Sequence, residues 1–240
     1  ASEKRRALTA IFIVFLFIFS EMLVLDNNNY VELEENTKSR SIVSYSVNSN
    51  VYISSGLPDD NFGSSNDNYI GIDAQENEYR SLYRFTNNLS SNNDLIISAS
   101  LTLTCDVVSQ NLPGQIPTLY AARVNANFDA SDVTWNEITD SISWQIAGVK
   151  GDQDRDDWDI PAVNTIINTN TYSYELNVTK QVQTALDLGR NKFDFVLSAL
   201  GGQINCAKSN NATSSFHPEL VILRSQGVHG DGGFVQQNFA

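Results

Sequence analysis

The chain has 240 residues, with 15 Lys and Arg against 28 Asp and Glu, so its formal net charge is −13 at pH 7. Its hydrophobic content of 41% is adequate for the core of one ordinary domain. Because so acidic a surface repels phosphate backbones, the composition argues against nucleic acid as a partner and leaves cations and neutral polymers open.

An apolar stretch comes first in the chain. Residues 7–25 are apolar except for Thr9, Ser20 and Glu21, and they directly follow three basic residues. A stretch of this length is long enough to span a bilayer as a helix, with its basic side in the cytoplasm. We therefore predict an N-terminal hydrophobic signal or anchor helix over residues 1–25, in contact with the membrane through residues 7–25.

Three fates of this segment stay open. No small-x-small cleavage site follows the apolar core, which disfavours a cleaved secretory signal and favours a retained anchor. The tetrad Arg6-Ala7-Leu8-Thr9 resembles the class III signal of archaeal pilins and archaellins. That resemblance implies processing just before a helix that then packs in a filament.

The rest of the chain is predicted as a polar spacer over residues 26–44, a domain over residues 45–225 and a Gly-rich tail over residues 226–240. The tail is either a frayed terminus or a strand donated to a neighbouring subunit.

The domain is predicted to be all-β. Its short apolar alternations are broken by Gly, Asn, Asp and Ser, which is typical of a sandwich rather than of βαβ units. We expect a jelly-roll β-sandwich of about nine strands with one short helix. The expected strands cover residues 42–47, 50–54, 69–72, 80–85, 96–107, 118–124, 172–177, 193–200 and 220–224.

The expected helix covers Thr179–Leu188. Val182, Ala185 and Leu186 fall on one side of it, and Gly189 stands where a helix stop belongs. We expect this helix to cap one end of the sandwich.

Cys105 and Cys206 are the two cysteines of the chain. Each lies in a strand-like run with apolar residues at alternate positions, so both side chains are expected to point into one interior. If the two strands are neighbours, a disulfide is expected in an oxidising compartment. The alternative is a pair of buried free thiols.

Seven segments, taken in chain order, resemble the DNRLRE domain family. They are residues 52–65 (YISSGLPDDNFGSS), residues 80–85, residues 97–103, residues 133–136 (VTWN), Trp144 with residues 148–154, residues 176–183 and residues 217–223. The family includes disaggregatase-related archaeal surface proteins and alginate-type carbohydrate-binding modules. The resemblance implies a jelly roll without catalytic machinery of its own, found on secreted or surface proteins.

From these features we expect a non-catalytic, extracellular module, tethered to the membrane, that binds or organises cell-surface polysaccharide or other envelope polymers. The alternative is a structural subunit of an extracellular filament, sheath or membrane-associated complex that assembles through its sandwich and termini. An enzyme is not expected, because His217 and His229 form no recognisable triad or zinc spacing.

The candidate metal ligands are Asp152, Asp154 and Asp156, which stand at alternate positions in the acidic segment of residues 151–159. Oxygen ligands at this spacing are able to converge on one hard cation, so Ca²⁺ is the candidate cofactor. A solvated acidic loop is the alternative.

The candidate ligand-binding residues are Trp144 and Trp158, which flank the three candidate metal ligands. Flat aromatic faces match the apolar faces of pyranose rings, so these two side chains are candidates for a sugar-stacking platform. Trp135 lies within one of the family-like segments and is expected in the core.

Three sequons are candidate glycosylation sites if the protein is exported. Their asparagines are Asn88, Asn177 and Asn211.

Overall fold

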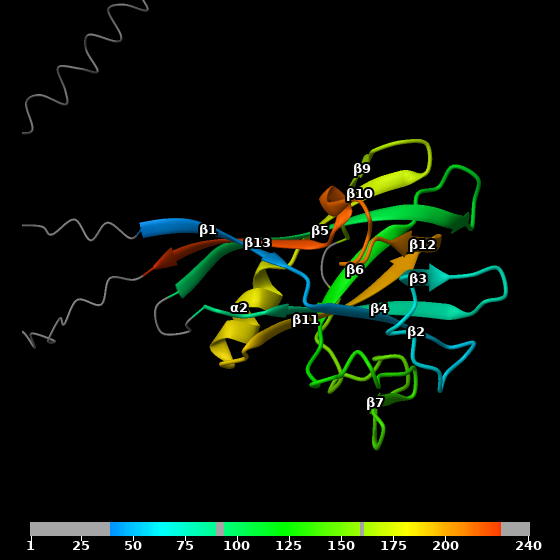
Figure 1. The fold of residues 1–240 in the computed structure, drawn as a ribbon, viewed down its shortest axis with the longest axis horizontal. Coiled ribbons are helices and arrows are strands. Elements are labelled where there is room, and N and C mark those ends of the chain that lie inside the picture. Colours follow the sequence, from blue (N-terminus) through cyan, green and yellow to red (C-terminus); the bar gives the residue numbers. More distant parts are fainter. Residues whose placement is uncertain (1–38, 90–93, 159–160, 227–240) are drawn as a thin grey trace, which may run out of the picture. The chain divides into compact units, whose positions relative to one another are not determined.

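The computed structural model describes residues 39–89, 94–158 and 161–226, which fold as a curled antiparallel β-sandwich (Figure 1). The expected all-β class is therefore confirmed. The expected N-terminal helix and the C-terminal tail from residue 227 onward lie outside the described residues. Within the described ranges, no helix is long and apolar enough to cross a bilayer.

Thirteen strands, one α-helix and one 3₁₀ helix make up the described part of the chain. The strands are β1 (Ser39–Ser46), β2 (Ser49–Ser54), β3 (Tyr69–Ile72), β4 (Glu78–Thr86), β5 (Asp94–Gln110), β6 (Thr118–Arg123), β7 (Glu137–Thr139), β8 (Ile142–Ser143), β9 (Val163–Ile166), β10 (Thr171–Asn177), β11 (Lys192–Leu200), β12 (Gly202–Cys206) and β13 (Glu219–Gln226). The helices are α2 (Thr179–Asp187) and η1 (Ser214–Phe216).

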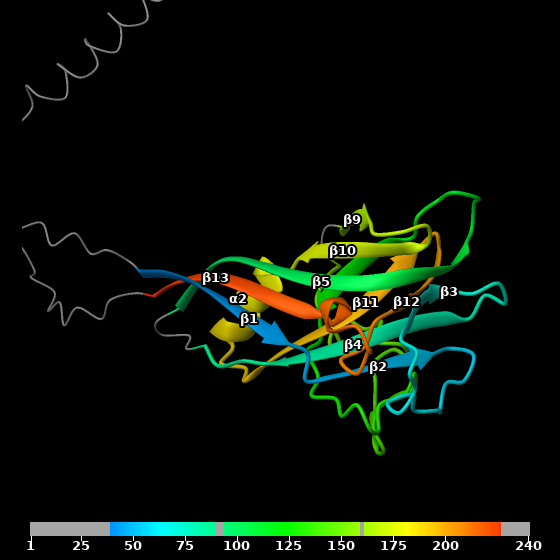
Figure 2. The same ribbon diagram turned by 45° about the horizontal axis from the view of Figure 1, so that its top comes forward.

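The main sheet runs in the order β1-β13-β5-β12-β3-β4-β11-β6, and β7 pairs separately with β8. Three strands branch from it: β10 pairs with β5, β9 pairs with β10, and β2 pairs with β4. Figure 2 shows the two layers that result, with β5, β10 and β13 on one side and β2 and β4 on the other. Because β12 and β3 join β5 to β4, they carry the sheet from one layer to the other.

The strands β3 and β12 approach each other too closely for side chains at their contact. Gly71 has a φ of +109°, and a Cβ placed on it would lie 2.1 Å from the carbonyl oxygen of Gly202. Glycine is the residue that tolerates both the backbone angle and the distance. The passage of the sheet from one layer to the other, through β12 and β3, therefore depends on this pair of glycines.

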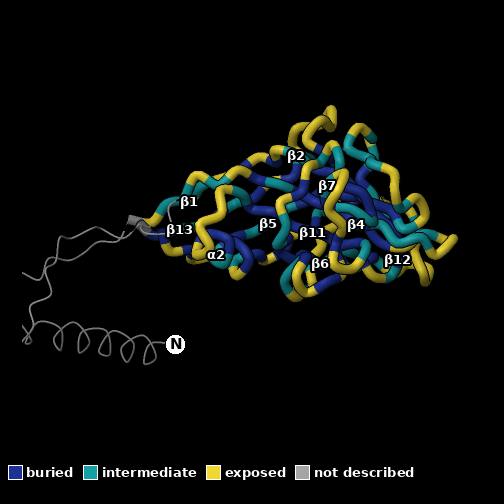
Figure 3. Tube along the Cα trace, turned by 90° about the horizontal axis from the view of Figure 1, so that it is seen from below, coloured by how far each residue is buried: buried dark blue, intermediate teal, exposed yellow. Residues whose placement is uncertain are grey.

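The main core lies between the layers and includes alternate residues of β4, β5, β10 and β11. A second core lies on the outer side of the same sheet, where residues 124–149 cover Leu82 of β4 and Val196 of β11. In Figure 3, buried residues concentrate along the strands and exposed ones in the connections. Because both sides of the sheet are covered here, β4 and β11 are buried at successive positions rather than at alternate ones.

The expected helix is present as α2, which buries Val182, Ala185 and Leu186. It ends one residue before the expected bound, and Gly189 follows it with a φ of +65°. The predicted C-terminal bound of the spacer, residue 44, lies inside a strand. β1 begins at Ser39 and pairs along its whole length with β13.

Candidate functional site

Asp154 of the acidic segment is a buried structural acceptor. Its side chain is 3% exposed. It accepts hydrogen bonds from the backbone N–H groups of Gln145 at 2.8 Å, Ile146 at 3.1 Å and Gly151 at 3.0 Å. The carboxylate thus closes a loop in the chain, and both of its oxygens are already engaged with the protein.

The other two aspartates do not face the same site as Asp154. Asp156 forms a two-bond ion pair with Arg123, at 2.8 and 3.0 Å, whereas Asp152 is exposed. In the described part of the chain, no three His, Cys, Asp or Glu side chains are grouped so that they could hold a metal ion. The convergence that the spacing of Asp152, Asp154 and Asp156 indicated is not found, and we place no Ca²⁺ on these residues.

Trp144 is not available as a stacking surface. Its side chain is 4% exposed, and its indole N–H donates to the carbonyl oxygen of Thr134 at 3.0 Å. Trp135 is buried in the same outer core. Gly148 lies directly against the ring of Trp135, since a Cβ at Gly148 would lie 2.5 Å from it. Trp135 and Trp144 therefore belong to the cover of the sheet. The expectation that Trp144 contributes to an exposed sugar-stacking platform is wrong, because its ring is buried.

Trp158 retains partial exposure. The guanidinium carbons of Arg80 and Arg155 lie 5.3 and 4.4 Å from the centre of its ring. Two cations therefore already occupy positions over this aromatic surface. The structure does not bring Trp144 and Trp158 together as one exposed platform.

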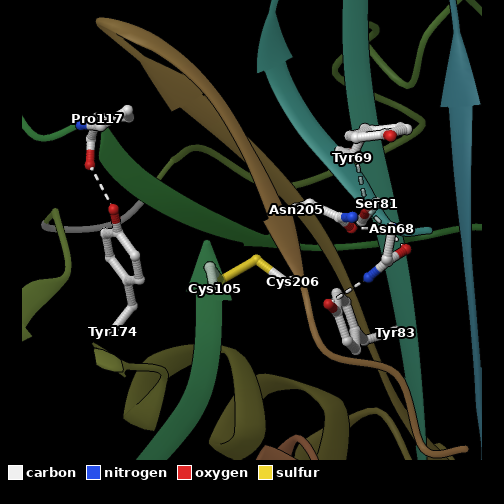
Figure 4. Close-up of a disulfide and its surroundings, with 9 residues drawn as sticks. All are labelled: Asn68, Tyr69, Ser81, Tyr83, Cys105, Pro117, Tyr174, Asn205 and Cys206. Carbon is white, nitrogen blue, oxygen red and sulfur yellow. Dashed lines mark hydrogen bonds between the residues drawn. A yellow bond between two sulfur atoms is a disulfide. The ribbon is translucent and has the colours of Figure 1, made fainter. Parts of the chain in front are cut away.

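Cys105 of β5 and Cys206 of β12 form a disulfide across two paired strands. Both side chains lie in the main core, as the alternation of apolar residues indicated. Figure 4 shows this bond linking the two strands, with Asn205 beside it. The three sequon asparagines, Asn88, Asn177 and Asn211, are exposed.

A polar hollow opens beside the disulfide, and we call it the disulfide pocket. Its volume is about 220 Å³. It is formed by an interior part of β5, the start of β10 and the end of β12, together with the loop before β3 and the segment after β12. Its lining residues are Asn66, Thr104, Asp106, Thr171, Asn205, Cys206, Ala207, Lys208, Asn210, Asn211 and Phe216.

Hydrogen bonds fix the polar side chains at the floor of the disulfide pocket. The Asn205 side chain accepts from the backbone N–H of Asn68 and donates to Asp67, each at 2.8 Å. Thr171 donates its hydroxyl to Asp106. Because these groups are held by partners from other strands, they keep their orientation without a ligand.

Asn68 extends this network into the core. Its side-chain amide donates to the Tyr83 hydroxyl and accepts from Ser81 at 3.0 Å (Figure 4). Burial raises the pKa of Tyr83 well above its usual range, so this hydroxyl stays protonated. The wall of the pocket is thereby anchored in the sandwich.

Lys208 forms one side of the disulfide pocket and is 6% exposed. Its Nζ donates to the backbone carbonyl oxygens of Ser65 at 2.7 Å and Gly63 at 3.4 Å. Burial lowers the pKa of the Lys208 ammonium, and the attraction of Asp67 opposes this shift. The side chain ties the segment after β12 to the loop before β3.

Sequence reasoning missed this pocket, although it had a signal. Asn205, Lys208 and Asn210 all lie within a few residues of Cys206, whose strand-like run of alternating apolar residues predicts a buried side chain. His217 also lies nearby, with Nε2 2.7 Å from the carbonyl oxygen of Asn211. His229 lies outside the described residues.

The model of one protein family, carbohydrate-binding module family 96, matches residues 41–224. The matched range begins inside β1 and ends inside β13, so it covers the sandwich and every residue of the disulfide pocket. No curated protein matches the chain.

Proposed function

The chain belongs to carbohydrate-binding module family 96, and from this premise we propose that its sandwich binds a neutral polysaccharide in the disulfide pocket without catalysing a reaction on it. The observation that carries the proposal is the pre-arranged polar lining of that pocket. Its amides and hydroxyls both donate and accept hydrogen bonds, as recognition of sugar hydroxyls requires. Phe216, which is half-buried at the rim, offers an aromatic face.

Charge supports a neutral ligand over an acidic one such as alginate, which the alginate-type modules of the resembling family would suggest. Asp106 contributes an exposed carboxylate to the pocket, while the Lys208 ammonium is buried against backbone carbonyls. The whole chain carries a formal charge of −13, so a polyanionic ligand would be repelled at long range. A neutral glycan incurs no such penalty.

We further propose that the module acts outside the cell, tethered to the membrane through residues 7–25. The apolar composition of this segment and the basic residues before it support a membrane anchor. The disulfide supports an oxidising compartment. In this setting, the module binds or organises polysaccharide at the cell surface.

The test is a glycan-binding array, followed by calorimetry with the full chain in a detergent that lacks a sugar headgroup. Asn66 is exposed and lines the pocket. Asn66→Ala should weaken binding about three- to tenfold, which corresponds to one lost hydrogen bond. Asn164→Ala is the matched control, because Asn164 is equally exposed on β9 and lines no part of the pocket.

An array without binding to any neutral polysaccharide would overturn the proposed function. If the Asn66→Ala variant and the wild type both fold and bind with equal affinity, the glycan binds somewhere other than the disulfide pocket. Selective binding of polyanionic glycans would contradict the choice of a neutral ligand.

A second candidate function, assembly into a filament or sheath, is favoured by one observation. Strand β9 has all four residues exposed, with Val163 at 72% and Ile166 at 64%, and among the described strands it pairs only with β10. Residues 160–174 contain no charged side chain. An uncharged, apolar sheet edge is a template for pairing with another strand. We therefore propose pairing of β9 with β9 of a second copy as one of the contacts of such an assembly, since this pairing alone closes as a dimer.

A further inference from the structure

A second hollow lies next to the disulfide pocket, and we call it the serine pocket. Its volume is about 600 Å³. Lys208 and Asn210 line both hollows, so they form the boundary between them. The serine pocket is lined by Ser49, Asn50, Asn61, Gly63, Ser64, Ser65, Ala130, Ser131, Lys208, Ser209 and Asn210.

The chemistry of the serine pocket is neutral and hydrogen-bonding. Its lining contains hydroxyl and amide side chains but neither a carboxylate nor an aromatic ring. Lys208 is the charged residue of the lining, and its ammonium donates to the carbonyl oxygens of Ser65 and Gly63. The surface therefore suits a polar, uncharged group rather than an ion or an apolar side chain.

Asn50 provides a donor that the protein leaves unused. This residue, on β2 opposite Tyr83, is 5% exposed and lines the serine pocket. Its side-chain Nδ2 is buried and has no hydrogen-bond partner among the described residues. A buried donor without an acceptor is costly, so the Asn50 side chain gains a hydrogen bond if it rotates toward an acceptor oxygen that a ligand brings into the serine pocket.

We propose that the disulfide pocket and the serine pocket form one groove for two consecutive segments of a neutral glycan chain, which crosses Lys208 and Asn210 between them. This inference rests on the proposed function and extends it. A sugar hydroxyl in the serine pocket accepts the hydrogen bond from Asn50. Affinity therefore depends on chain length, because only a chain long enough to cross the boundary fills both hollows.

The test uses the full chain in a detergent without a sugar headgroup, titrated by calorimetry with cello-, manno- and xylo-oligosaccharides of increasing length. The wild type should bind the longest members of one series about tenfold more tightly than its shortest binding member, as expected for two or more additional hydrogen bonds. The shortest binding member reports on one hollow and the longest on both.

Ser64→Trp is designed to fill the serine pocket and leave the disulfide pocket open, because Ser64 is exposed and lines only the former. The variant should lose the tenfold gain with length and keep the affinity for the shortest ligand. Ser141→Trp, at an exposed position that lines neither hollow, is the matched control and should behave as wild type. If Ser64→Trp does not fold, Ser209→Trp takes its place. Ser209 is exposed, lies in the segment after β12 and lines the serine pocket.

The outcomes separate the two proposals. The proposal of one continuous groove is overturned if the wild type binds oligosaccharides of every length with equal affinity, or if the Ser64→Trp variant keeps the gain in affinity with length. Either result leaves the proposed function intact. Failure of the wild type to bind any neutral oligosaccharide or polysaccharide would overturn both.

Discussion

Asp154 shows how a single carboxylate organises the cover of the sheet. It collects three backbone N–H groups from two segments, residues 145–146 and residue 151, and so holds the loop that carries Trp144. The alternate spacing of Asp152, Asp154 and Asp156 was a poor guide because the backbone there is not a strand. The N–H groups of Asp154 and Arg155 both donate to the carbonyl oxygen of Gly151, which makes a turn. Residues in a turn do not share a face every second position.

We predict that Asp154→Ala destabilises the sandwich by about 3 kcal/mol, because it leaves three backbone N–H groups without their acceptor. Urea unfolding monitored by tryptophan fluorescence measures the change. Asp152→Ala is the matched control, since Asp152 is exposed, and it should alter the free energy of unfolding by less than about 0.5 kcal/mol. Similar losses in the two variants would show that Asp154 does not hold the loop.

At the scale of elements, apolar patterning indicated nine strands that have at least one buried face, and it missed four others. All nine expected strands are present, and β7, β8, β9 and β12 are additional. β7 and β8 have three and two residues, too few to carry a pattern. β9 is exposed at all four positions, so burial gives its sequence no alternation. The pattern was seen around Cys206, but not as a separate strand, because β12 follows β11 after the single residue Gly201.

The exposed edge of β9 gives the element-scale prediction. If β9 mediates assembly, Ile166→Lys should reduce self-association at least tenfold, since a charge on an edge strand opposes pairing with a second copy. Analytical ultracentrifugation over a range of protein concentrations measures the association. Ile142→Lys, on the exposed strand β8, adds the same charge elsewhere and should have no effect. A wild type that stays monomeric at all concentrations would remove this function from consideration.

For the whole molecule, the disulfide is the long-range constraint that the sequence indicated most directly. It joins residues 101 positions apart and lies where β5 meets β12, close to the crossing between the layers. What patterning did not indicate is the outer core of residues 124–149, because a cover made of turns has no period. That omission is also why Trp144 was expected at the surface. Patterning did not indicate the disulfide pocket either, since its lining comes from segments far apart in the chain.

We predict that the double variant Cys105→Ala and Cys206→Ala loses about 3 kcal/mol of unfolding free energy, because a loop of this length is no longer closed in the unfolded chain. Urea unfolding with and without a reductant measures it. Reductant should lower the stability of the wild type and leave the variant unchanged. Equal stability of the two proteins would show that the disulfide contributes nothing to folding.

The pairing of β1 with β13 has a mechanical consequence. Ser39 faces Gln226 and Ser46 faces Glu219, so the first residue of β1 and the last residue of β13 lie at one end of this strand pair. η1 and Phe216 of the disulfide pocket precede the other end of β13. Backbone hydrogen bonds lie perpendicular to antiparallel strands. If the proposed tether pulls at Ser39 and the proposed glycan pulls at Phe216, the tension runs along β1 and shears all of its bonds with β13 at once. A pull that separates Ser39 from Gln226 breaks the same bonds one after another, so the sandwich resists load from its ligand better than load across its own two ends.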